Sequence, residues 1–134
     1  MNRVFLDANV LFSAAYLPDS GLTKLWSLGV DLITSAYAIE EARRNLATGD
    51  ERRRLERLLE PLTIVQETDR ARRLPKGVDL PDKDVPILLA ALSANATHLV
   101  TGDTTHFGVL YGVTIAGTTI LAPAAYLKLF PDAS

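Results

Sequence analysis

The stretch RVFLDANVLF, residues 3–12, places an acid and an amide between two apolar runs. Residues 4–6 have the continuous apolar pattern of a buried strand, and residues 10–12 continue it. Asp7 and Asn9 stand between the two runs, although burying a lone carboxylate is costly unless a donor or a cation meets it. This local conflict indicates a polar site at the end of the first strand.

Outward from this stretch, strands alternate with helices along the chain. Apolar runs predict further strands at residues 31–35, 62–65 and 98–101, and one or two short edge strands within 113–121. Helical patterns predict a short helix before Gly29 and others at residues 36–47, 49–61, 69–74, 83–96 and 123–130, with 102–108 as a loop. Such alternation predicts an α/β fold, with parallel strands joined by right-handed crossovers and helices on both faces. We expect residues 1–134 to form a single domain.

Composition limits the class of protein. The chain of 134 residues is 48% hydrophobic and contains no cysteine, which excludes disulfides, thiolate metal sites and cysteine catalysis. No run approaches the roughly 18 apolar residues of a membrane span. The first residues lead directly into a strand and lack the pattern of a signal peptide. We therefore expect a cytoplasmic protein with no membrane partner.

Positive charge is concentrated in one segment. Residues 43–76 hold ten of the 14 Lys and Arg residues, although the net charge of the chain is −2. A basic surface of this kind suits the phosphate backbone of a nucleic acid. The alternative is a solvated helix face with ion pairs, and the i,i+4 pairs Arg52–Glu56 and Glu40–Arg44 have the spacing for it.

Four acids are expected at one edge of the sheet. Asp7 and Asp103 follow different strands, and ligands of parallel sheets bind outside the carboxyl ends of the strands. Glu41 lies at the border of the buried face of its helix. Asp84 falls within the first turn of a buried helix, on the line of its interior side, and Asp82 is expected to cap that helix.

Each of these acids also has a purely structural explanation. Asp7 with Asn9 fits an Asx turn, Asp84 favours a helix dipole, and the TGD of residues 101–103 fits a turn after a strand. Taken together, four converging acids would repel one another unless a cation held them. A set of oxygen ligands without thiolates favours Mg²⁺ or Mn²⁺.

Four motifs carry a resemblance to a known family. They are VFLDANVLFSA (4–14), IEEARRNL (39–46), DKDVPILLAAL (82–92) and LVTGDTTHFG (99–108). In order and spacing they resemble the acidic motifs of PIN-domain proteins, a family that includes the small VapC-type toxins. The resemblance extends from Arg3 to Phe130. It implies a three-layer α/β/α sandwich with a mainly parallel sheet, a metal-dependent endoribonuclease activity and, for the VapC type, the toxin role of a toxin–antitoxin pair.

The resemblance also implies roles for individual residues. It assigns catalysis to Asp7, Glu41, Asp84 and Asp103, and it assigns metal binding to the three aspartates. Asn9 and Thr101 match positions that support the metal site. Substrate contacts are expected from Arg43, Arg44 and His106. A water molecule activated by Mg²⁺ or Mn²⁺ would then hydrolyse the RNA phosphodiester.

The chain departs from the family pattern after the fourth acid. Family members often carry a further acid there, where this chain has Thr104, Thr105 and His106. A second metal ion would then be weakly held or would arrive with substrate. The alternative for His106 is structural, because His106 and Phe107 could simply close the loop against the core.

Other functions compete with the nuclease. A phosphatase of the haloacid dehalogenase type needs a second Asp where this chain has Asn9, and a phosphoacceptor receiver domain needs a late Lys, for which only Lys128 remains. A non-catalytic PIN fold that binds RNA or protein is the main alternative. Besides RNA, the expected partners are an antitoxin and a second copy of the chain. Leu22, Leu25 and Trp26 are candidates for an apolar contact between two copies of the chain, unless Trp26 packs on the sheet.

Overall fold

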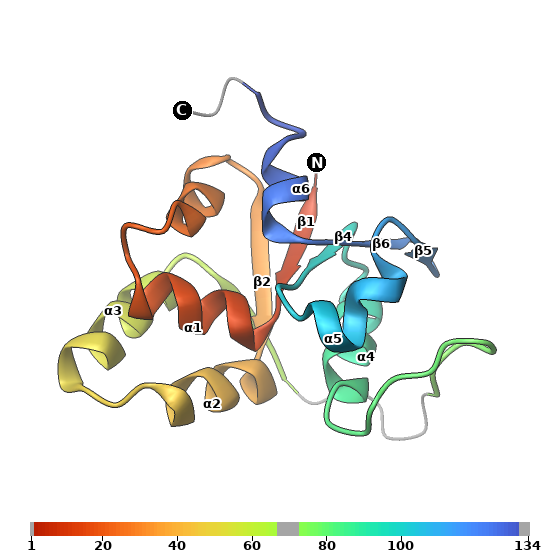
Figure 1. Ribbon diagram of the computed structural model, residues 1–134, viewed down its shortest axis with the longest axis horizontal. Coiled ribbons are helices and arrows are strands. Elements are labelled where there is room, and N and C mark those ends of the chain that lie inside the picture. The colour runs from red at the N-terminus through yellow and green to blue at the C-terminus, as the bar shows by residue number, and fades with distance from the viewer. Residues whose placement is uncertain (1, 67–72, 132–134) are drawn as a thin grey trace.

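The computed structural model contains one six-stranded sheet with the strand order β3-β2-β1-β4-β6-β5 (Figure 1). It describes residues 2–66 and 73–131. The strands are β1 (Arg3–Leu6), β2 (Asp31–Ser35), β3 (Thr63–Val65), β4 (His98–Val100), β5 (Thr114–Ile115) and β6 (Thr118–Leu121). All neighbours pair in parallel except β5 and β6, which are antiparallel. The predicted mainly parallel sheet is confirmed.

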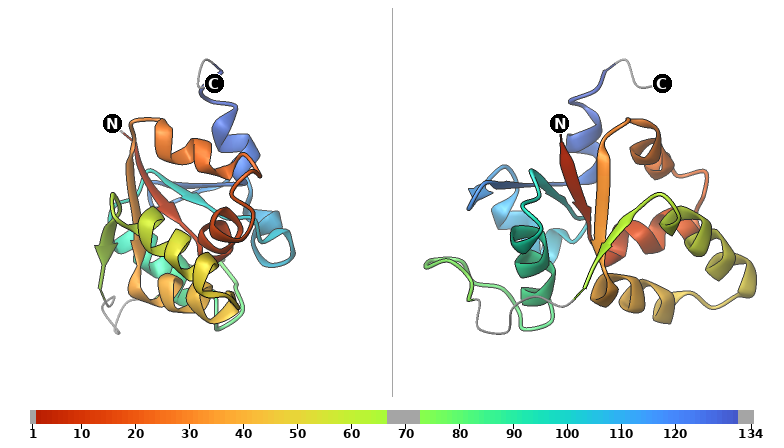
Figure 2. Two further views of the ribbon diagram at one scale, coloured as in Figure 1. Left: turned by 90° about the vertical axis from the view of Figure 1, so that its left-hand side faces the viewer. Right: turned by 180° about the vertical axis from the view of Figure 1, so that it is seen from behind.

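Helices lie on both sides of this sheet and make a three-layer α/β/α sandwich. Helix α1 contacts α2 and α3 on one side of β1 and β2, whereas α4 and α5 lie on the other side (Figures 1 and 2). The α-helices are α1 (Ala8–Tyr16), α2 (Ala36–Asn45), α3 (Gly49–Leu59), α4 (Val85–Ser93), α5 (Thr104–Phe107) and α6 (Pro123–Leu127). Two 3₁₀ helices, η1 (Leu22–Ser27) and η2 (Gly108–Leu110), complete the described elements.

The first strand lies at the centre of the core. Val4, Phe5 and Leu6 are fully buried, because β1 pairs with β2 and β4 and is covered by helices on both faces. Every residue of α4 from Ile87 to Leu92 is also buried, as its apolar sequence predicts. The carboxyl ends of β1 and β4 thus emerge from the buried centre of the fold.

Local signals define the beginnings of two helices. Ser35 caps α2 as predicted, since its hydroxyl accepts a 3.1 Å hydrogen bond from the amide of Ala38. Helix α3 begins with a capping box, in which Thr48 and Glu51 each accept a hydrogen bond from the other's backbone. These caps hold α2 and α3 in place next to α1.

Helix α4 is shorter than the predicted helix 83–96. It begins after Asp84, which takes the N-cap position that was expected for Asp82. It ends at Ser93, and Asn95 has a left-handed backbone with φ of 56°, so Asn95 is not on the helix.

Other predicted elements also differ. The loop predicted at 102–108 contains α5, because the Asp103 side chain caps a helical turn. The predicted 113–121 region forms a hairpin in which only β5 is an edge strand, since β6 pairs with β4. The helical turn predicted at 69–74 lies mostly outside the described residues.

Both predicted i,i+4 ion pairs are replaced by others. Arg43 contacts Glu56 at 2.7 Å and Glu40 at 3.5 Å, because its side chain extends from α2 to an acid on α3 and also meets one on α2. Arg52 instead donates a hydrogen bond from Nε to the carbonyl of Leu46. The pairs with Glu56 and Glu40 are exposed to solvent and contribute little to the free energy of unfolding.

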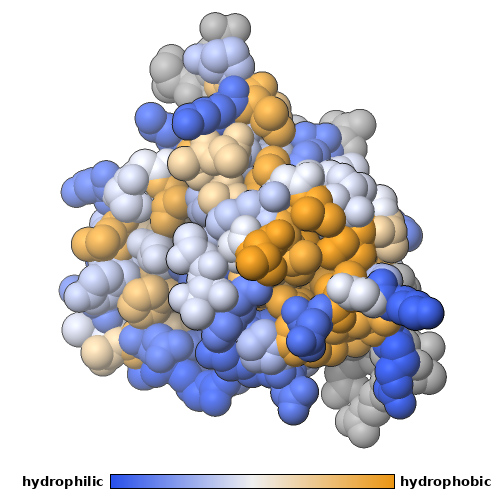
Figure 3. Space-filling model, turned by 45° about the vertical axis from the view of Figure 1, so that its right-hand side comes forward, coloured by the Kyte–Doolittle hydropathy of each residue, from blue (hydrophilic) through white to orange (hydrophobic). Residues whose placement is uncertain are grey.

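The surface combines polar and apolar areas. Figure 3 shows apolar side chains gathered on the side on which α4 and α5 lie, with hydrophilic side chains around them. Among the described residues, the large apolar side chains with high exposure are Tyr16, Leu17, Tyr37, Ile64, Val109, Val113 and Leu129. Within the described ranges, no helix has the length and apolar character needed to cross a membrane.

Candidate metal centre

A pocket of about 500 Å³ lies where β1 and β4 end. It is lined by the four predicted acids together with neutral residues and one lysine. The lining residues are Asp7, Ala8, Asn9, Phe12, Glu41, Ala42, Asn45, Lys83, Asp84 and Asp103. Side chains from four separate segments of the chain therefore converge on one cavity.

Asp7 is fixed by several hydrogen bonds at the start of α1. Its Oδ1 accepts a 2.6 Å hydrogen bond from the amide of Ala8. Its Oδ2 accepts hydrogen bonds of 2.8 Å from Thr101 Oγ1 and 3.2 Å from Asn9 Nδ2. A carboxylate oxygen can accept two bonds, so Oδ1 retains one acceptor position.

The charge of Asp7 is unfavourable where it lies. Only 3% of the residue is exposed, and this burial raises the pKa of Asp7 to about 6. The hydrogen bonds from Thr101 and Ala8 oppose that rise, whereas the nearby charges of Glu41 and Asp84 add to it. A cation in the pocket would relieve both the desolvation and the repulsion.

Thr101 and Asn9 hold the two strand ends together. Thr101 Oγ1 donates to Asp7 and accepts hydrogen bonds from Asn9 Nδ2 at 3.2 Å and from the Asp103 amide at 3.1 Å. The amide of Gly102 donates a 2.7 Å hydrogen bond to Asn9 Oδ1. A Cβ at Gly102 would lie 3.2 Å from that oxygen, so the close approach favours glycine. Asn9 and Thr101 thus hold Asp7 and the strand end before Asp103 in place, as expected of residues that support a metal site.

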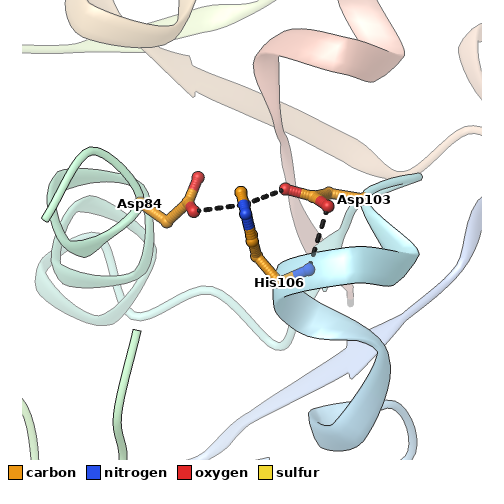
Figure 4. A group of neighbouring side chains, drawn as sticks. All are labelled: Asp84, Asp103 and His106. Atoms are coloured by element: carbon orange, nitrogen blue, oxygen red, sulfur yellow. Dashed lines mark hydrogen bonds and ion pairs between the residues drawn. The ribbon is translucent and has the colours of Figure 1, made fainter. Parts of the chain in front are cut away.

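A second group of side chains bridges α4 and α5. His106 Nδ1 lies 2.8 Å from Asp84 Oδ2 and 2.9 Å from Asp103 Oδ2 (Figure 4). The other oxygen of Asp103 accepts a 3.0 Å hydrogen bond from the His106 amide, which fixes the carboxylate at the start of α5. Burial raises the pKa of Asp84, while the nearby imidazole of His106 opposes this effect.

Glu41 approaches the pocket from α2. Its charge, together with that of Asp84, adds to the effect of burial and raises the pKa of Tyr37. The hydroxyl of Tyr37 donates a 2.7 Å hydrogen bond to the carbonyl of Lys83, which connects α2 to the segment before α4. Glu41 therefore lines the pocket from α2, close to the segment that leads into α4.

Two polar residues that line the pocket were not among the predicted site residues. Asn45 follows Glu41 by one helical turn, and its amide bonds to the carbonyl of Glu41 at 2.9 Å. Lys83 directly precedes Asp84 and is the one basic residue among those that line this pocket. The i,i+4 spacing from Glu41 could have identified Asn45, whereas no sequence signal separates Lys83 from other lysines.

The predicted substrate-binding residues lie elsewhere. Neither Arg43 nor Arg44 lines the pocket, and Arg43 is held by Glu56 and Glu40. His106 lies against two carboxylates, and Phe107 beside it is fully buried. The part of the basic segment at 70–72 is outside the described residues.

The donor set fits a divalent cation. Asp84 Oδ2 and His106 Nδ1 are buried, and neither makes a well-directed hydrogen bond to any described residue despite their short separation. Asp7 Oδ1 keeps a free acceptor position, and Glu41 and Asp103 supply further carboxylate oxygens. Carboxylate oxygens are the ligands of Mg²⁺ and Mn²⁺ in proteins.

Comparisons with known proteins agree with this architecture. A similar fold occurs in the crystal structure of VapBC2 from Rickettsia felis bound to a DNA fragment from the VapBC2 promoter. One chain of that structure superposes on this protein with a TM-score of 0.68 and 16% sequence identity, and the match covers 90% of this chain and 98% of that chain. This likeness shows the fold. A search of curated proteins found no match. A family model described as PIN domain matches residues 3–105, and the chain therefore belongs to the PIN domain family.

Proposed function

We propose that this protein is a metal-dependent endoribonuclease. The observation that carries the proposal is the convergence of four acids from separate segments on one pocket: Asp7, Glu41, Asp84 and Asp103. Burial of the Asp7 carboxylate, which raises its pKa, and the repulsion among the four acids both destabilise the fold, and a bound cation would offset both effects. Membership of the PIN domain family supports the same reading.

The carboxylates would hold Mg²⁺ or Mn²⁺. Asp7, Asp84 and Asp103 are the proposed ligands. Glu41, on α2, adds a fourth negative charge to the pocket. When bound, such an ion lowers the pKa of a coordinated water and neutralises charge on a phosphate.

The other residues of the pocket position these groups. Thr101 and Asn9 orient the Asp7 carboxylate by donating to its Oδ2, and the second acceptor position of Oδ1 stays available for a cation. The Lys83 ammonium group is suited to hold the RNA phosphate at the rim of the pocket, without reading the base. Arg44 is exposed and could extend this contact along the strand.

The proposal is tested by cleavage of a structured RNA in the presence of Mn²⁺. We expect EDTA to abolish cleavage by the wild type and Asp103→Asn to lose it with Mn²⁺ present. Asp79→Asn is the matched control, because Asp79 is exposed and does not line the pocket. Cleavage that persists in Asp103→Asn would contradict the proposal, and metal-independent RNA binding without cleavage would favour the non-catalytic alternative.

A second pocket, which is mainly apolar, favours an additional role of this protein as the toxin of a toxin–antitoxin pair. This pocket of about 250 Å³ lies between α1, η1 and α3. Trp26 and Leu58 provide much of its apolar lining, and Arg54 and Arg57 are also among its residues. Such a cavity suits an apolar side chain of a partner segment that also carries acids. The resemblance to VapC-type toxins, and the similar fold of a chain in the VapBC2 structure, support an antitoxin as the partner.

This role is tested by expressing the chain with and without the product of a neighbouring short open reading frame. We expect the chain alone to arrest the growth of the host cells and the product of the neighbouring frame to relieve this arrest. The relief should be weaker for the Arg57→Glu variant than for the control variant Lys76→Glu. Absence of arrest, or equal relief in both variants, would contradict it.

The predicted homodimer remains a prediction, and its proposed contact must be corrected. Leu25 is fully buried in the core and is unavailable for a contact. Trp26 lies next to α3 and donates a 2.8 Å hydrogen bond from Nε1 to the carbonyl of Leu58.

A further inference from the structure

We propose that His106 is a metal ligand, and that it gives this site a preference for first-row transition ions such as Mn²⁺ over Mg²⁺. The inference rests on the proposed function, because it concerns the chemistry of the same cation site. It also reassigns His106, for which a substrate contact was predicted.

The geometry of three ligand atoms carries this inference. Asp84, Asp103 and His106 each offer one donor atom, and the three atoms all lie within 4.8 Å of one another. They come from two elements, since Asp84 lies at the N-cap of α4 and the other two lie at the start of α5. Figure 4 shows the imidazole between the two carboxylates.

The separations match those around a small divalent ion. Two neighbouring ligands of an octahedral ion with bonds near 2.1 Å are about 3 Å apart. His106 Nδ1 lies 2.8 Å from Asp84 Oδ2 and 2.9 Å from Asp103 Oδ2. Both separations match those of neighbouring ligands in one coordination shell, and all three donor atoms lie within 4.8 Å of one another.

Hydrogen bonding accounts poorly for this arrangement. His106 Nδ1 lies at ion-pair distance from both carboxylates, but Nδ1 and Asp84 Oδ2 are buried and neither forms a well-directed hydrogen bond with a described residue. Asp84 itself is only 8% exposed, so its oxygen has little access to bulk water. Buried polar atoms without such partners are unusual, and a shared cation satisfies both.

The ligand types determine the preferred metal. Mg²⁺ prefers oxygen ligands, whereas imidazole nitrogen suits first-row transition ions. Mn²⁺ accepts both kinds of donor, so a site of two carboxylates and one imidazole favours Mn²⁺ over Mg²⁺.

Pulsed electron paramagnetic resonance of the full chain loaded with Mn²⁺ tests the ligation directly. A coordinated imidazole produces a characteristic ¹⁴N modulation, and the chain has only two histidines. We expect this modulation in the wild type and in His98→Gln, where His106 is the sole histidine, and its loss in His106→Asn. His98 serves as the control because it packs edge-to-face on Tyr126 and does not line the pocket.

Binding titrations with Mn²⁺ and Mg²⁺ test the preference. In His106→Asp all the proposed ligands become oxygens. We expect the ratio of Mn²⁺ to Mg²⁺ affinity to fall, because the imidazole that disfavours Mg²⁺ is replaced by a carboxylate.

The outcomes separate this inference from the proposed function. Mn²⁺ binding without ¹⁴N modulation in the wild type and His98→Gln, or an unchanged affinity ratio in His106→Asp, would overturn the inference and leave the nuclease proposal standing. Absence of Mn²⁺ binding in the wild type would overturn both. The His98→Gln measurement keeps the ligation testable even if variants at His106 fail to fold.

Discussion

The side chain of Asn9 connects the first turn of α1 to Gly102, whose amide donates a 2.7 Å hydrogen bond to Asn9 Oδ1. The other end of the same amide group donates to Asp7 Oδ2 and to Thr101 Oγ1. One side chain thus fixes the relative positions of the carboxyl ends of β1 and β4. The acids that follow these strands depend on this connection for their common orientation.

Replacing Asn9 with Asp tests the connection. The change puts an oxygen where Nδ2 now donates to Asp7 Oδ2 over 3.2 Å. In EDTA at pH 7.5 we expect the free energy of unfolding to fall by about 2 kcal/mol, as for loss of a hydrogen bond to a charged group. Denaturant titration measures this change. The control is Asn45→Asp, because that amide is exposed and bonds a backbone carbonyl. Equal losses in the two variants would contradict the prediction.

The buried carboxyl of Asp7 makes stability dependent on pH. Its pKa in the folded protein is about 6, above the ordinary value of 3.8, because burial disfavours the charge. The native state therefore binds the proton more tightly than the unfolded state. Stability is lost as pH rises from 3.8 to about 6 and is level above that range, with a full cost of about 3 kcal/mol.

Unfolding in EDTA at several pH values measures this cost. We expect the free energy of unfolding of Asp7→Asn, relative to that of the wild type, to rise by about 1 kcal/mol between pH 5 and pH 7.5, on top of a pH-independent cost of its altered hydrogen bonds. Asp19→Asn is the control, since Asp19 is exposed. A difference that stays constant or shrinks over this interval would argue against a raised pKa at Asp7.

Lys83 is expected to contribute to RNA affinity. It lies at the metal pocket, so its positive charge can contact a phosphate next to the bound ion. In an Asp103→Asn background, Lys83→Gln should weaken binding and reduce the slope of log affinity against log salt by about 0.7 for a single strand. Fluorescence anisotropy over a range of salt concentrations measures both effects. If Lys24→Gln, a change in η1 away from the pocket, has the same effect, Lys83 has no specific role.

Much of the fold is determined by signals that the sequence displays locally. The apolar run at β1 indicates a central strand, and Ser35 marks the start of α2. Tertiary contacts are harder to predict. Arg43 makes its shorter ion pair with Glu56, which is 13 residues away on α3, and a longer one with Glu40 on its own helix. The end of α4 depends on the left-handed backbone of Asn95, which the apolar pattern does not reveal.

The candidate site was predictable to a similar degree. Parallel strands bring their carboxyl ends to one edge, so the positions of Asp7 and Asp103 follow from the strand assignments. The position of His106 between Asp84 and Asp103 depends on how α4 approaches α5 and on the helical turn after Asp103. That turn was predicted as a loop, and a loop does not specify the direction of its side chains.

Thermal unfolding with and without Mn²⁺ tests most directly whether the acids hold a cation. Asp84 and Asp82 form a matched pair, since Asp84 is buried at the pocket and Asp82 is exposed nearby. Binding to the native state alone stabilises it by about 2.7 kcal/mol at 100 times the dissociation constant. We predict that Mn²⁺ raises the Tm of the wild type and of Asp82→Asn and leaves that of Asp84→Asn nearly unchanged. Equal shifts in all three proteins, or no shift in any, would contradict the account.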